Sequence, residues 1–168
     1  STAKSLTVSG GTLKLDGIVG QTNPLSSITT TNSGNLTTTA AISNAATLSV
    51  AGTSSIGGNI TTSSTQTYTG AVTLSASPTL TTTANTITFT STVNATDAAD
   101  RDLTFGTGTG TATFTGAVGT TNNLGTITNA ANQQLTFSDA VTANTIANYG
   151  TLLFNATSAK TISPAITG

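Results

Sequence analysis

One hexapeptide occurs four times in the middle of the chain, and this recurrence restricts the possible folds more than any other feature. Each copy reads Thr, an aromatic residue, a hydroxyl residue, a small or turn residue, Ala or Thr, and Val. The spacing between copies is uneven but stays within a narrow range. A recurrence of this kind is typical of a repeat architecture. The four copies are Thr67–Val72, Thr88–Val93, Thr113–Val118 and Thr136–Val141.

The length of the repeat matches one turn of a β-solenoid. A unit of about 21–25 residues is much shorter than a β-sandwich domain of about 100 residues. It accommodates two or three strands of about five residues, each followed by a turn. We therefore predict that residues 1–168 form a single all-β segment, a parallel β-helix (β-solenoid) with turns of about 21–25 residues, belonging to a longer or polymeric rod. An antiparallel β-sandwich is the alternative.

The aromatic position of the hexapeptide is the candidate core. Alternation along a strand turns the flanking threonines outward and the ring inward. Each ring is then expected to lie above its equivalent in the next turn, as a structural core stack. The predicted stack consists of Tyr68, Phe89, Phe114 and Phe137.

Two weaker patterns accompany the hexapeptide. An apolar-Thr pair lies upstream of the hexapeptide, as at Leu80-Thr81, and predicts a further strand in the turn. In three cases the apolar residue of the pair precedes another apolar or aromatic residue by eight positions. This step joins Ile28 to Leu36, Ile60 to Tyr68 and Ile127 to Leu135. Asparagines at the expected corners suggest side-chain ladders along the rod. These are Asn35, Asn59, Asn132 and Asn148.

The composition argues against most kinds of chemistry. The chain has no Cys, no His and no Glu, so thiolate catalysis, disulfides and imidazole metal sites are excluded. Four basic residues in a chain of net charge −1 are too few for nucleic acid or an anionic membrane surface. We predict a protein that is not an enzyme, carries no cofactor and does not insert into a membrane.

The five aspartates are the remaining reactive groups, and three of them lie close together in the sequence. Asp97, Asp100 and Asp102 surround Arg101. The favoured interpretation is a charged surface loop that keeps the rod soluble. The alternatives are an oxygen-ligand Ca²⁺ site and a glycosidase acid/base pair.

The repeat resembles the filamentous-haemagglutinin-type β-strand repeats of large bacterial exoproteins, which include two-partner-secretion adhesins and autotransporter passengers. The resemblance rests on the stretches 59–74, 86–94 and 102–119, and it covers about residues 28–141. It implies a right-handed parallel β-helix, export as an unfolded chain and an extracellular or cell-surface location. It also implies that the repeats serve mainly as a rigid spacer.

Three functions follow as hypotheses. The first is an adhesin or exoprotein stalk for adhesion or extracellular scaffolding. The second is a filament or surface-layer subunit that stacks end to end. The third is an ice-binding or polysaccharide-binding β-helix, which the uneven repeat spacing disfavours. The expected partners are copies of the chain or adjacent repeats, joined through strand edges, together with host or cell-surface glycans.

Overall fold

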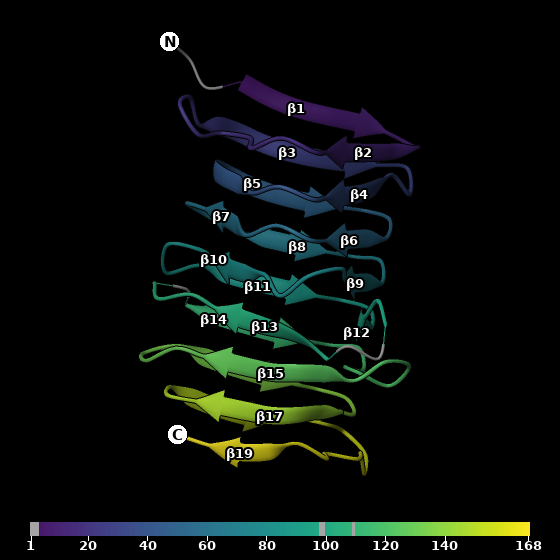
Figure 1. Ribbon diagram of the computed structural model, residues 1–168, viewed down its shortest axis with the longest axis vertical. Coiled ribbons are helices and arrows are strands. Elements are labelled where there is room, and N and C mark those ends of the chain that lie inside the picture. The colour runs from purple at the N-terminus through teal and green to yellow at the C-terminus, as the bar shows by residue number, and fades with distance from the viewer. Residues whose placement is uncertain (1–3, 98–99, 109) are drawn as a thin grey trace.

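The computed structural model describes residues 4–97, 100–108 and 110–168. Within these ranges the chain is all-β and contains no helix (Figure 1). Its strands are short, and their side chains alternate between buried and partly exposed. This alternation follows from the threonine-rich sequence, because β-branched residues favour extended backbone and occupy outward positions.

The paired strands of the described residues run parallel to one another. They stack as a β-solenoid of about eight turns, with the N-terminus at one end of the stack and the C-terminus at the other (Figure 1). The predicted solenoid is thus confirmed, and the antiparallel β-sandwich is wrong. At about 4.8 Å per turn the stack is about 38 Å long.

The chain passes along three faces of the solenoid in each complete turn. The first and second faces belong to one 14-stranded sheet, and the third is a 5-stranded sheet. The first face contains β7 (Ile60–Thr62), β10 (Thr79–Thr81), β13 (Arg101–Phe105), β15 (Leu124–Asn129), β17 (Ala143–Asn148) and β19 (Ala165–Thr167). The second contains β1 (Lys4–Ser9), β3 (Leu25–Thr31), β8 (Gln66–Tyr68), β11 (Thr86–Phe89), β14 (Thr111–Phe114), β16 (Gln134–Phe137) and β18 (Thr151–Phe154). The third contains β2 (Thr12–Leu15), β4 (Asn35–Thr38), β6 (Ser54–Ile56), β9 (Val72–Leu74) and β12 (Val93–Ala95). The long strand β5 (Ile42–Val50) pairs with both β7 and β8 and so joins the first two faces.

The turns vary in length more than the hexapeptide spacing predicts. The rings from Tyr68 to Phe137 pair in the order of the hexapeptides, so each spacing between copies is one turn. Val50 pairs with Tyr68, and Phe137 pairs with Phe154. The partners in both of these pairs lie closer in sequence than any two successive hexapeptides. The two turns that flank the hexapeptide region are therefore shorter than predicted, because their loops are shorter.

The core consists of side-chain columns that run the length of the stack. The second face contributes a column in which Val50 precedes the rings of Tyr68, Phe89, Phe114, Phe137 and Phe154. The third face contributes the column Leu13, Leu36, Ser54, Val72, Val93, Val118, Val141 and Ile162. Equivalent residues of successive turns therefore pack on one another along the stack, as in other solenoids.

The eight-residue step does not mark equivalent positions. Ile28 lies on the second face, opposite Leu48, whereas Leu36 lies on the third face, opposite Ser54. Ile60 and Ile127 both lie on the first face, but Ile60 belongs to the column of Leu80 and Phe105 and Ile127 to that of Leu103. The apolar-Thr strand predicted upstream of the aromatic strand is nevertheless present, as β7, β10 and β15. Only the fixed step of eight residues fails to mark a single position.

Side-chain carbonyls connect one turn to the next at the corners. The Oδ1 atom of Asn35 accepts a hydrogen bond from the backbone N–H of Thr53 at 2.8 Å, and Asn59 bonds Thr79 in the same way. A direct asparagine contact joins Nδ2 of Asn129 to Oδ1 of Asn148 at 2.7 Å. The corner asparagines thus bond mainly to backbone groups of the following turn. Asn132 is instead a turn residue with φ of +63°.

A polar network is buried inside the second face. Gln66 and Tyr68 are fully buried, and the hydroxyl of Tyr68 donates to Oε1 of Gln66 at 3.0 Å. The Nε2 group of Gln66 donates in turn to the carbonyl of Thr81 at 2.9 Å. Burial raises the pKa of Tyr68, so the phenol stays protonated and remains a donor. Each polar group here has a partner, which a buried amide requires.

Candidate functional site

Asp97, Asp100 and Asp102 flank the connection from the third face back to the first. Asp97 follows β12, and Arg101 begins β13. The Nη2 atom of Arg101 donates to Oδ2 of Asp97 at 3.0 Å, which forms an ion pair across this connection. Since both side chains are partly exposed to water, this pair contributes little to stability.

The other two aspartates bond to later turns. The Oδ1 atom of Asp102 accepts from the backbone N–H of Thr126 at 2.6 Å. The Oδ2 atom of Asp100 accepts from Nδ2 of Asn144 at 2.9 Å, and the backbone of Asp100 has φ of +48°. The three carboxylates therefore serve three different contacts.

The described residues contain no group of three or more acidic, His or Cys side chains placed to hold a metal ion. The structure does not bring Asp97, Asp100 and Asp102 together as a Ca²⁺ site would need. A shallow depression beside Asp100 is lined by Thr121, Asn122 and Asn123, and it adds amide and hydroxyl groups but no further carboxylate.

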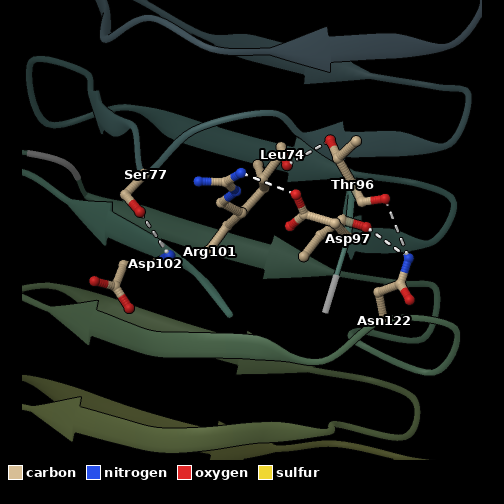
Figure 2. A network of polar contacts seen from close by, with 8 residues as sticks. Leu74, Ser77, Thr96, Asp97, Arg101, Asp102 and Asn122 are labelled. Carbon is tan, nitrogen blue, oxygen red and sulfur yellow. Dashed lines mark hydrogen bonds and ion pairs between the residues drawn. The ribbon is translucent and has the colours of Figure 1, made fainter. Parts of the chain in front are cut away.

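Neighbouring turns bond to residues on both sides of this connection (Figure 2). The hydroxyl of Thr96 donates to the carbonyl of Leu74 at 2.8 Å, and Nδ2 of Asn122 donates to the carbonyl of Thr96 at 3.4 Å. The backbone N–H of Asp102 donates to Oγ of Ser77 at 3.0 Å. Thr96 and Asp102 are therefore anchored to adjacent turns.

A second candidate site is a regular array of hydroxyls on the second face. Strands β8, β11 and β14 and the residues beside them each present three threonines outward, at every second position. The side chains between them, such as Gln66, Ile87 and Ala112, are buried. We call this array the threonine grid; it consists of Thr65, Thr67, Thr69, Thr86, Thr88, Thr90, Thr111, Thr113 and Thr115.

Strand pairing places the grid in rows and columns. Thr67 pairs with Thr88, and Thr88 pairs with Thr113. Thr86 pairs with Thr111. The ladder continues past the strands, because the N–H of Thr90 donates to the carbonyl of Tyr68 and that of Thr115 to the carbonyl of Phe89. Thr90 and Thr115 therefore also lie in register.

The ring stack lies directly behind the grid. The rings of Tyr68 and Phe89 are stacked with centroids 5.0 Å apart, and those of Phe114 and Phe137 with centroids 4.9 Å apart. All four side chains are at most 1 % exposed. The structure thus places the four predicted core aromatics in one column. Offset-stacked aromatic pairs contribute about 0.5–1.5 kcal/mol beyond their buried area.

The sequence alone does not reveal the grid as a single surface. Its only signal is three Thr-x-Thr-x-Thr segments, which begin at Thr65, Thr86 and Thr111. The uneven spacing of these segments argues against a regular face. The structure shows that loops elsewhere in the turn absorb the difference in length.

No family model, curated protein or solved structure matches this chain. The resemblance to filamentous-haemagglutinin-type repeats therefore stays a prediction based on the sequence motifs. In the part of the chain that the structure describes, no helix has the length and apolarity needed to span a bilayer.

Proposed function

We propose that this chain is a structural segment of an extracellular or cell-surface protein, serving as the stalk of an adhesin or other exoprotein. The proposal is supported first by the uniform core. Successive turns repeat the same columns, so a longer rod is made by adding turns without changing its width. A spacer needs this property, because its task is to hold a distant region at a fixed separation.

The single observation that carries the proposal is the continuity of the column from Val50 to Phe154. Each residue of this column packs on the equivalent residue of the next turn. Bending the rod would separate stacked rings and parallel ladders on one side of the stack. Dense contacts between turns therefore favour a stiff segment over a flexible linker.

The surface chemistry is consistent with a spacer exposed to water. Charged residues make up 5 % of the chain, and the outward strand positions are mostly Thr, Ser and Asn. Such a surface offers hydrogen bonds without attracting charged partners. Adhesion to host or cell-surface glycans then belongs to a region carried by the rod or to a local patch on it.

Electron microscopy of the purified chain in negative stain tests the stalk. The stalk proposal predicts short, straight rods of constant width. Globular particles or flexible threads would contradict it.

A filament or surface-layer subunit is the second candidate, and the continuous columns of the core favour it. A second copy of the chain supplies the same strand edges and columns as further turns of the same chain would. Long fibres of constant width in the same images would favour this candidate over the stalk.

A further inference from the structure

The threonine grid combines regular spacing in two directions. Along a strand, outward side chains repeat every two residues, or about 6.7 Å. Across the strands, the paired residues Thr67, Thr88 and Thr113 lie one strand spacing apart, or about 4.8 Å. The nine hydroxyls therefore occupy a nearly rectangular lattice.

The lattice also keeps one register across the three turns. Pairing of β8, β11 and β14 shows no register shift. Equivalent threonines in the three turns therefore lie directly opposite one another on the same side of the sheet.

The grid hydroxyls are free to bond outside the protein. Among the described residues, none of the nine side chains has a hydrogen-bond partner within the chain. Outward hydroxyls elsewhere are engaged, as when Thr53 donates to Asn35 and Thr39 to Asp16. The nine threonines carry no charge, so the grid is complementary to a neutral hydrogen-bonding partner.

The shape of the grid indicates an extended partner. Sites for small molecules are concave and enclose most of the ligand, whereas the grid is a plane of half-exposed side chains on three neighbouring strands. No aromatic ring points outward within it, so it lacks the stacking platform that sugar rings use. A flat, neutral, periodic partner fits best.

We propose that the threonine grid binds ice. Each threonine presents a hydroxyl that can take a lattice position of water and a methyl group that limits the freedom of neighbouring water molecules. An ice face offers a matching surface, because it is uncharged, periodic and made of hydrogen-bonding groups. Because three turns present three hydroxyls each, many weak contacts form together on one crystal plane. This function goes beyond the proposed role as a stalk.

Thr88 at the centre of the grid gives the most direct test. Replacing Thr88 with Tyr puts a bulky ring on the plane without burying a polar group. Thr73→Tyr is the matched control, because Thr73 is also an outward, half-buried threonine in a strand but lies on the third face. Circular dichroism and thermal unfolding establish that both variants remain folded.

The readouts are the shape of a single ice crystal growing in the protein solution and the adsorption of fluorescently labelled protein to an ice surface. We expect the unmodified chain to facet the crystal and adsorb to it, Thr88→Tyr to lose both effects, and Thr73→Tyr to keep them. No faceting by the unmodified chain would overturn the proposal, as would equal loss in both variants. Binding to an insoluble polysaccharide without any effect on ice would also overturn it.

Discussion

The ring of Phe89 lies 4.6 Å from the ring of Phe114, with 8° between their planes, although the two rings belong to different copies of the hexapeptide. Both rings are fully buried. Phe105 from the first face meets Phe114 edge-on at 5.9 Å. The stacked pair joins two turns and the edge-on pair joins two faces of the core, so Phe114 is the natural place to test the packing.

Replacing Phe114 with Ala should lower the free energy of unfolding by about 3–5 kcal/mol, because a large cavity opens in the column. Thr113→Ala is the matched control in the same strand, since its side chain points outward and should cost less than about 1 kcal/mol. Phe114→Asp should prevent folding, because it buries an unpaired charge. Denaturant unfolding measures the free energy of unfolding of all three variants. Equal values for Phe114→Ala and Thr113→Ala would contradict the inward position of the ring.

Replacing Tyr68 with Phe removes one hydroxyl from the buried network. Oε1 of Gln66 then loses its donor, which should cost about 1–3 kcal/mol. The double variant with Gln66→Leu should recover part of this loss, because it removes both partners. A double-mutant cycle by denaturant unfolding measures the coupling, and zero coupling would mean that the two groups do not interact.

Removing one whole turn should leave a folded, shorter rod. Deleting residues 69–89 joins Tyr68 to Thr90 and brings Tyr68 against Phe114, because Phe89 pairs with both rings. Deleting residues 69–79 removes about half a turn and should prevent folding, since every later side chain would change face. Circular dichroism measures the β-structure of the two deletion variants, and solution scattering measures their compactness. If both variants folded, or neither did, the result would argue against turns that stack as independent units.

Gly119 should tolerate no side chain. Its φ is +69°, and a Cβ atom there would collide with the backbone carbonyl of Thr142 in the next turn. Gly11 has φ of +67° but open space around it, so Gly11→Ala isolates the cost of the conformation, about 1–2 kcal/mol. Gly119→Ala should lose clearly more stability by thermal unfolding. Equal losses would show that the turns can move apart there.

Acid should weaken the fold through a small number of carboxylates. A hydrogen bond from Lys160 holds the pKa of Asp139 below its ordinary value, and Lys14 and Thr39 do the same for Asp16. Because the folded-state pKa is the lower one, this stabilisation is complete above about pH 4 and is lost as the pH falls through the folded-state pKa. Melting temperatures should therefore decline in acid, and less so in Asp139→Asn. An unchanged acid response in that variant would exclude a role for Asp139.

The sequence predicted the solenoid and the ring stack because the hexapeptide combines a strand period with a repeat period. It could not predict the shorter turns that flank the hexapeptides, or that Val50 takes the place of a ring in the column. The sequence also did not predict that Gln66 is buried, because a polar residue between threonines is expected to face water. Its burial depends on the hydrogen bonds to Tyr68 and Thr81, which only the structure shows. The contacts of Asp100 and Asp102 depend on residues one or two turns later, which no local pattern reveals.

The central claim is that the chain forms a stiff spacer outside the cell. The most direct measurement uses an antibody against this segment on intact source cells, with gold-labelled antibody viewed in the electron microscope. A surface spacer predicts labelling of unpermeabilised cells, with gold at a constant distance from the surface. Labelling only after permeabilisation would contradict the claim.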